Sequence, residues 1–152
     1  MTADTDLLGS LHSIMKKLRK MMDRELFSLG MGHTEMRLLM ILYNNDGCQQ
    51  EKLGSQLEVD RSNVGRALKK LEELGYVKRQ RDDEDGRAYK VFLTKSSWAV
   101  RDQVLEIRSN LKKTLTRGIT AKELKTLAEL LRKADGQLSE KNYRTIKHQG
   151  QK

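Results

Sequence analysis

Apolar residues recur at steps of three and four along most of the chain, a spacing that places them on one face of an α-helix. Residues 7–29 show this pattern first and predict a long amphipathic helix that ends at Gly30, a residue suited to a left-handed stop. Residues 35–43 are apolar on nearly all sides, so we expect a short helix, capped by Thr34, in the middle of a core.

A second pair of helices is predicted after a turn at residues 44–47. Residues 49–56 form the first of the pair, and residues 57–59 make a tight connection to the next. Asp60 is a good N-cap for the fourth helix, residues 61–73, where apolar side chains again recur on one face. The order helix, tight turn, helix is typical of a helix-turn-helix motif.

Two short strands follow the fourth helix. Residues 76–81 and 87–93 flank the acidic, glycine-containing segment 82–86, which has the composition of a hairpin tip. The second strand alternates, and one of its faces is expected to be buried: Tyr89, Val91 and Leu93. With this hairpin, the segment between Gly47 and Thr94 is predicted to be a winged helix-turn-helix.

The rest of the chain predicts two more helices. Thr94 begins a fifth helix, with Trp98 on its apolar stripe, that ends at Gly118. Thr120 and Glu123 have the spacing of a capping box for a sixth helix.

No repeat or linker divides the chain, so we expect one mostly α-helical domain, residues 1–152, with a small β-hairpin wing. The winged helix-turn-helix occupies residues 34–94 of it, and residues 141–152 form a polar tail. The helices of residues 6–30 and 95–140 have longer apolar stripes than the small central core can bury, so association of two copies is expected to cover them. The alternative is that these helices fold back on their own domain.

The charge balance narrows the class of partner. The 152 residues include 30 lysines and arginines against 21 acids, a formal net charge of +9, with an isoelectric point near 9.7. Nucleic acid is the commonest partner of so basic a chain, although a membrane surface or solubility alone would give the same balance.

The same composition predicts a cytoplasmic protein. The single cysteine, Cys48, cannot form an internal disulfide and suits a reducing compartment. Asp4 and Asp6 stand where a secretory signal would have basic residues, and no apolar run approaches the roughly 20 residues that a membrane span needs.

The fourth helix has a small, polar and cationic face opposite its apolar side. Its predicted DNA-binding residues are Arg61, Ser62, Asn63, Arg66, Lys69 and Lys70. Arg66 projects away from the apolar side and is expected to contact a base edge, since arginine can pair bidentately with guanine. Lys70 lies nearer the rim and is expected to contact phosphate. Alone, these residues would be a solvated face balanced by Glu72 and Glu73, but the tight turn before the helix and the basic hairpin after it favour DNA binding.

The hairpin adds further cations: Lys78, Arg79, Arg81, Arg87 and Lys90. The carboxylates at its tip would repel phosphate if all of them faced DNA. We therefore expect Asp85 to support the wing by pairing with Arg87 and fixing its direction, while the other acids face solvent. The alternative is a hairpin tip kept soluble by mixed charge.

From about Leu7 to Leu138 the chain resembles the MarR family of bacterial and archaeal regulators. The resemblance rests on the motif's first helix, the end of its second helix with the strand that follows, and the wing: Leu53, Leu57 and Val59; Leu71-Glu72-Glu73-Leu74-Gly75-Tyr76-Val77-Lys78-Arg79; Asp85-Gly86-Arg87; Leu93-Thr94. Ser97 departs from the pattern, because family members usually have glycine there.

The resemblance implies a homodimer joined by the first, fifth and sixth helices, with Arg87 entering the minor groove of DNA. It also implies release from DNA by a small, often anionic aromatic effector bound between the dimerisation helices and the DNA-binding region. Basic residues of the first helix are candidates for the effector's counter-charge, although a solvated face is the default interpretation: Lys16, Lys17, Arg19 and Lys20.

Other functional classes find little support. The three histidines lack the spacing of metal ligands, so no metal or other cofactor is expected: His12, His33 and His148. Cys48 has no adjacent cation to lower its pKa and is expected to be a semi-buried structural thiol, since oxidant-sensing cysteines of the family lie in the first helix. No nucleophile–base pair, phosphate-binding loop or carboxylate pair stands out, so an enzyme is not expected.

We therefore predict a sequence-specific transcriptional regulator, a repressor in preference to an activator, that binds a pseudo-palindromic double-stranded DNA operator as a homodimer. Two alternatives remain open. One is a non-specific architectural DNA-binding protein, and the other is a helical protein–protein interaction module.

Overall fold

A computed structural model of the protein describes residues 6–138. Within the described residues the chain forms two compact units, divided between Leu111 and Lys112. The predicted polar tail, residues 141–152, lies outside the described residues. None of the helices that the structure describes is long and apolar enough to cross a membrane.

The first unit begins with the predicted amphipathic helix, α1 (Leu7–Leu26). It tightens into a short 3-10 turn, η1 (Phe27–Leu29), and Gly30 then takes a left-handed φ of 71°. α2 (His33–Asn44) follows and is central to the core, as its sequence indicates; its buried apolar residues are Met36, Leu38, Leu39 and Leu42.

The prediction that Thr34 caps α2 is wrong. The helix begins at His33, one residue before Thr34, and Gly32 occupies the cap position. The carboxylate of Glu35 accepts a hydrogen bond from the Gly32 N–H at 2.7 Å. The side chain of the third helical residue thus accepts the N–H of the cap residue, which is one of the two hydrogen bonds of a capping box.

The helix-turn-helix comprises α3 (Gln50–Leu57) and α4 (Arg61–Glu73), which match the predicted segments closely. Pattern analysis missed the short strand β1 (Cys48–Gln49) directly before α3. Two residues are too few for an alternating pattern, and this strand forms because β3 offers it a pairing edge.

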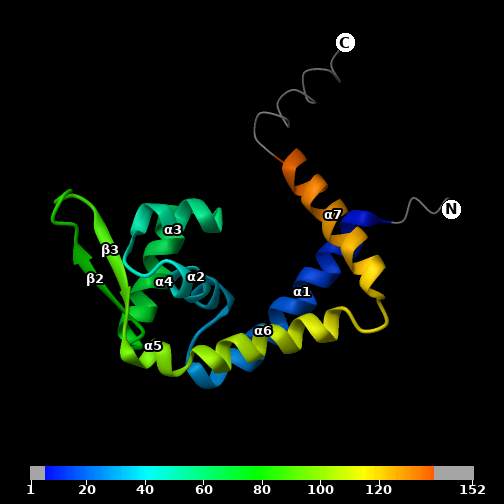
Figure 1. The fold of residues 1–152 in the computed structure, drawn as a ribbon, viewed down its shortest axis with the longest axis horizontal. Helices are drawn as coiled ribbons and strands as arrows, with labels where there is room; N and C mark the ends of the chain where they lie inside the picture. The colour runs from blue at the N-terminus through cyan, green and yellow to red at the C-terminus, as the bar shows by residue number, and fades with distance from the viewer. Residues whose placement is uncertain (1–5, 139–152) are drawn as a thin grey trace, which may run out of the picture. The chain divides into compact units, whose positions relative to one another are not determined.

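β1 belongs to a three-stranded antiparallel sheet with β2 (Val77–Arg81) and β3 (Tyr89–Leu93), in the order β1-β3-β2. β2 and β3 form the predicted hairpin beside α4, and their connecting tip extends away from α5 (Lys95–Ala99) (Figure 1). Of the three residues expected on the buried face of β3, Val91 is buried and Leu93 half-buried, but Tyr89 is 41% exposed. Tyr89 lies at the tip end of the hairpin, beyond the core that buries Val91.

The predicted fifth helix is two helices in the structure, α5 and α6 (Arg101–Leu115), interrupted at Val100. The backbone carbonyl of Ser97 would accept the Arg101 N–H in a continuous α-helix, but it accepts a 2.7 Å hydrogen bond from the Tyr43 hydroxyl. Burial raises the pKa of Tyr43 to about 12, so this hydroxyl stays protonated and able to donate.

Trp98, which the sequence places on the apolar stripe of this segment, is 45% exposed in the single chain. Its ring lies against Tyr43, with 5.4 Å between the ring centroids. Val104 and Ile107 of α6 are the residues of the predicted stripe that are fully buried in the first unit.

In the second unit α7 (Ala121–Gln137) begins at the predicted capping box. The Thr120 hydroxyl accepts the Glu123 N–H at 3.2 Å, and the Glu123 carboxylate accepts the Thr120 N–H at 2.8 Å. No residue of α7 is buried, although its leucines are regularly spaced.

Candidate nucleic-acid interface

A tight turn fixes the angle between α3 and α4. Glu58 adopts a left-handed backbone conformation with φ of 54°, and its N–H donates to the carbonyl of Gly54. On α4 the residues of the predicted apolar side are buried: Val64, Ala67, Leu68 and Leu71. The opposite side of α4 is therefore turned to solvent.

The residues that the sequence analysis assigned to DNA lie on that solvent-facing side. Asn63 is half-buried, and the other five are exposed: Arg61, Ser62, Arg66, Lys69 and Lys70. This orientation agrees with the helical-wheel argument that placed Arg66 opposite the buried side.

Contacts among these side chains hold several of them near the start of α4. The Arg61 guanidinium pairs with the carboxylate of Glu51 on α3. The Arg66 guanidinium donates to the side-chain oxygen of Asn63, whose amide nitrogen lies 3.5 Å from the Asp60 carboxylate. Asp60 therefore stands at the predicted N-cap position of α4, but its carboxylate contacts the Asn63 side chain and accepts no backbone N–H of the helix.

Lys70 lies at the rim of this face. Its ammonium nitrogen is 3.8 Å from the buried carboxylate of Glu35, the residue at the start of α2. The contact joins the recognition helix α4 to α2.

The contact between Asp85 and Arg87 differs from the one expected. The Asp85 carboxylate accepts a hydrogen bond from the backbone N–H of Arg87 at 3.1 Å. Within the described residues no ion pair joins it to the guanidinium of Arg87, which is exposed. Asp85 thus fixes the backbone of the wing at this point and leaves the Arg87 side chain free to turn.

The expectation that the other tip acids face solvent is wrong for Asp82. This residue is 3% exposed, and its carboxylate accepts a hydrogen bond from the side-chain amide of Gln49 at 3.0 Å. The ammonium of Lys90 lies 3.5 Å away. The hydrogen bonds from Gln49 and from the Glu84 N–H, with the charge of Lys90, lower the pKa of Asp82.

Arg79 is another wing cation with an internal partner. Its guanidinium donates to the Glu72 carboxylate at 2.8 and 3.1 Å, which joins β2 to the last turn of α4 and lowers the pKa of Glu72. Arg81 lies over the ring of Tyr89, with 5.9 Å from the guanidinium carbon to the ring centroid. The basic composition of the hairpin therefore overstates how many of its cations are free for phosphate.

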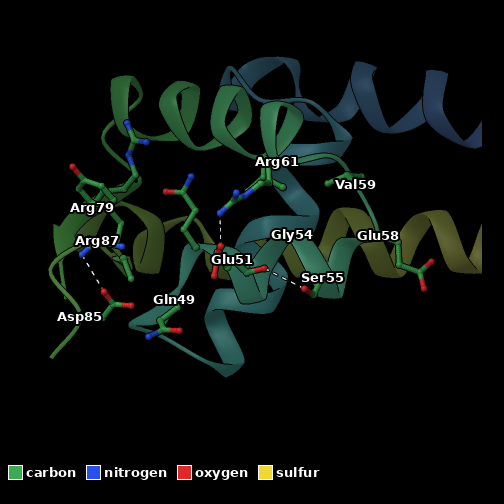
Figure 2. Close-up of a pocket in the computed structure, with 14 residues that line it drawn as sticks. Gln49, Glu51, Gly54, Ser55, Glu58, Val59, Arg61, Arg79, Asp85 and Arg87 are labelled. Carbon is green, nitrogen blue, oxygen red and sulfur yellow. Dashed lines mark hydrogen bonds and ion pairs between the residues drawn. The ribbon is translucent and has the colours of Figure 1, made fainter.

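A surface groove of about 900 Å³ separates the helix-turn-helix from the wing. Figure 2 shows Arg61 extending from α4 toward Glu51, while Arg79 and Arg87 approach from the wing. The lining combines three arginines with three acids, Glu51, Glu58 and Asp85, so the cations are balanced within the groove itself.

Cys48 is buried, and burial raises the pKa of its thiol. Both facts fit the structural role expected of it, because the reactive species of a cysteine is the thiolate. In residues 6–138 no group of three or more potential ligands is arranged to hold a metal ion.

Sequence reasoning missed Glu51, Gln49 and Asp82 as parts of this region. Glu51 and Arg61 are ten residues apart on different helices, and Gln49 and Asp82 are joined only through the sheet. Neither pairing has a spacing that a sequence pattern could detect.

A helix-turn-helix followed by a β-hairpin defines a winged helix-turn-helix protein. The MarR family model matches residues 31–89. The HTH-type transcriptional regulator YybA of Bacillus subtilis is 28% identical over 126 residues, 83% of this chain and 84% of the relative.

Solved structures of MarR-family regulators share this fold over most of the chain. A MarR transcriptional regulator from Methanosarcina mazei Go1 is 27% identical with a TM-score of 0.78, covering 86% of this chain and 96% of that one. A mutant MarR from E. coli in complex with operator DNA is 26% identical with a TM-score of 0.79, covering 86% and 94%. Residues 31–89 thus match the MarR family model, and over most of its length the chain is similar to MarR-family transcriptional regulators.

Proposed function

We propose that this protein is a repressor that binds one pseudo-palindromic DNA sequence as a homodimer in the cytoplasm, and that it is not an enzyme. The observation that supports this most directly is the start of α4, where a polar and cationic face is turned to solvent. Recognition helices place their N-terminal residues against base edges in the major groove. The operator complex of the E. coli relative supports the same class of partner.

In this proposal the DNA-binding residues divide by role. Arg66 contacts a base edge, with Ser62 and Asn63 beside it. Arg61, Lys69 and Lys70 contact phosphates, which position the protein without specifying sequence. Arg87 enters the minor groove, and Asp85 supports it through the backbone hydrogen bond at 3.1 Å.

The homodimer is proposed from the apolar side chains that each unit leaves exposed. On α1 these are Leu7, Leu8, Leu11, Ile14, Met15 and Met21. On α7 they are Leu127, Leu130 and Leu131. Soluble monomers rarely expose so many large apolar residues in one stripe, so a second copy is the expected cover.

A small anionic effector remains part of the proposal. A pocket of about 530 Å³ between α2, α3 and α6 combines apolar side chains with two arginines: Met36, Met40, Ile41, Leu57, Arg37 and Arg108. An apolar ring with a carboxylate would suit that lining. The candidates Lys16, Lys17, Arg19 and Lys20 are exposed and do not line it.

Selection of bound duplexes from a random DNA pool, followed by titration of the best sequence with salt, tests the proposed function. We expect a two-fold symmetric consensus and a preference of at least about 1,000-fold over unrelated DNA. Affinity that falls steeply with salt for every sequence alike would indicate an architectural DNA-binding protein. Absence of DNA binding at low salt would instead favour a protein–protein interaction module.

A further inference from the structure

Asp82 is buried at a place where a carboxylate would ordinarily be hydrated. It lies where β2 ends and the exposed tip of the wing begins. The buried polar or charged residues of the described chain are Glu35, Asp82 and Ser97. Burial of a charge is costly unless it is paired and hydrogen-bonded, so the surroundings of Asp82 must compensate for the lost hydration.

Three donors from three different segments surround this carboxylate. The Gln49 amide donates to one oxygen at 3.0 Å. The other oxygen accepts the Glu84 N–H at 3.1 Å and lies 3.5 Å from the ammonium of Lys90. Gln49 belongs to β1, Lys90 to β3 and Glu84 to the tip, so a single side chain joins the wing to the strand that directly precedes α3.

A continuous series of contacts leads from Asp82 to Arg87. The Asp82 N–H donates to the carbonyl of Ala88 at 2.9 Å, and the Ala88 N–H donates to the carbonyl of Asp85 at 2.9 Å. Asp85 in turn accepts the Arg87 N–H at 3.1 Å. The backbone of Arg87 is thus held at one end of the tip, and Asp82 holds the other end against the sheet.

We propose that Asp82 is a positioning residue for DNA binding, which fixes the wing tip to β1 and thereby sets where Arg87 meets the duplex. The inference rests on the proposed function. The carboxylate is charged at neutral pH, and both of its oxygens accept hydrogen bonds. Asparagine at this position would have one acceptor oxygen instead of two, so at least one of the donors would lose its partner.

The test compares Asp82→Asn with Asp83→Asn, each alone and combined with Arg87→Ala, on the selected operator. Asp83 is an exposed acid of the same tip, so its variant makes the same charge change without touching the buried contacts. Circular dichroism and the fluorescence of Trp98, the single tryptophan, confirm folding of every variant.

On charge alone, removal of either acid should leave DNA affinity unchanged or improve it. We expect Asp83→Asn to do so, and Asp82→Asn to weaken binding about tenfold, or about 1.4 kcal/mol. In the Arg87→Ala background Asp82→Asn should change affinity by less than about twofold, because interacting residues give non-additive effects. A merely structural role would weaken binding equally in both backgrounds.

The proposal is overturned if Asp82→Asn binds as Asp83→Asn does, or if its loss of affinity persists undiminished in the Arg87→Ala background. Gln49→Ala removes one donor and leaves the carboxylate, so it replaces Asp82→Asn if that variant does not fold, with the same two criteria. If the parent protein binds no selected duplex, the proposed function and this inference are both overturned. If the parent binds and Asp82→Asn binds with the same affinity as Asp83→Asn, only the inference is overturned.

Discussion

At the residue scale, three cations of the proposed interface already have protein partners. Arg61 contacts Glu51, Arg66 contacts Asn63, and Lys70 lies 3.8 Å from Glu35. The exposed ion pair of Arg61 and the exposed hydrogen bond of Arg66 contribute little to stability, so DNA can replace both partners at small cost. Lys70 differs, because its partner Glu35 is buried. Removal of the Lys70 ammonium would leave that carboxylate without its cation and so affect the fold as well as DNA binding.

We predict that Arg66→Ala lowers operator affinity by about 1–3 kcal/mol and relaxes the preference at one base pair, since a bidentate base contact is lost. Lys69→Ala is the matched control on the same exposed face. It should weaken all sequences alike and make the salt dependence shallower. Fluorescence anisotropy with single-base variants of the operator distinguishes a loss of base preference from a uniform loss of affinity. Unchanged base preference in Arg66→Ala would show that the orientation assigned to α4 is wrong.

The ion pair between Glu72 and Arg79 predicts a pH effect on stability. The guanidinium lowers the pKa of the folded Glu72 carboxyl, so the pair stabilises the protein above the ordinary glutamate pKa. That stabilisation is lost as the pH falls through the lower folded-state pKa. Between about pH 5 and pH 3 the parent should therefore lose more stability than Glu72→Gln.

Urea unfolding followed by Trp98 fluorescence at a series of pH values measures this difference. Glu73→Gln makes the same charge change at an exposed neighbour and serves as the control. Parallel pH dependences of the parent and Glu72→Gln would contradict a stabilising role for the pair.

At the element scale, the turn between α3 and α4 contains a residue in an unfavourable conformation. Glu58 has a φ of 54°, which an L-residue with a Cβ atom adopts at a cost of about 1–2 kcal/mol. The geometry of the helix-turn-helix requires that conformation, because the Glu58 N–H donates to Gly54 at the end of α3. The motif therefore retains local strain that the packing of its two helices offsets.

We predict that Glu58→Gly raises the free energy of unfolding by up to about 1 kcal/mol, since glycine adopts positive φ freely but has more freedom to lose on folding. Glu58→Ala removes the same charge and keeps the strain, so it should not stabilise the protein. Thermal denaturation of the parent, Glu58→Gly and Glu58→Ala measures the two changes in stability. An equal gain in both variants would assign the effect to charge.

At the scale of the whole molecule, the exposed apolar stripes make oligomeric state the central question. Leu131 of α7 is 46% exposed in the single chain. If a second copy covers it, a charge at that position must be buried without a partner, which is strongly unfavourable. DNA binding would fall with it, because a dimer presents two recognition helices to two half-sites.

We predict that Leu131→Glu shifts the protein toward monomers and lowers operator affinity at least about tenfold, whereas Thr126→Glu leaves both unchanged. Thr126 is exposed and lies on the side of α7 away from Leu131, about 140° around the helix. Sedimentation velocity over a range of concentrations measures the first effect, and DNA titration the second. A Leu131→Glu protein that remains dimeric would exclude α7 from the dimer interface.

Local patterns in the sequence were sufficient for much of the fold. The bounds of α4, the hairpin and the Thr120–Glu123 capping box follow from apolar spacing and cap residues, because these features depend on neighbours within one turn or one strand. The exposed face of α4 follows for the same reason, since burial of one side of a helix turns the other to solvent.

Only the tertiary structure decided features that depend on distant residues. β1 forms because β3 lies beside it, and the fifth helix is interrupted where Tyr43 bonds to Ser97, 54 residues away. The buried carboxylate of Asp82 and its contact with Gln49 likewise need strands that are far apart in sequence. Spacing along a chain determines which face a side chain occupies, but its partners across the fold depend on how the elements pack. That packing pairs Asp82 with Gln49 at the start of the wing tip, and Arg79 with Glu72.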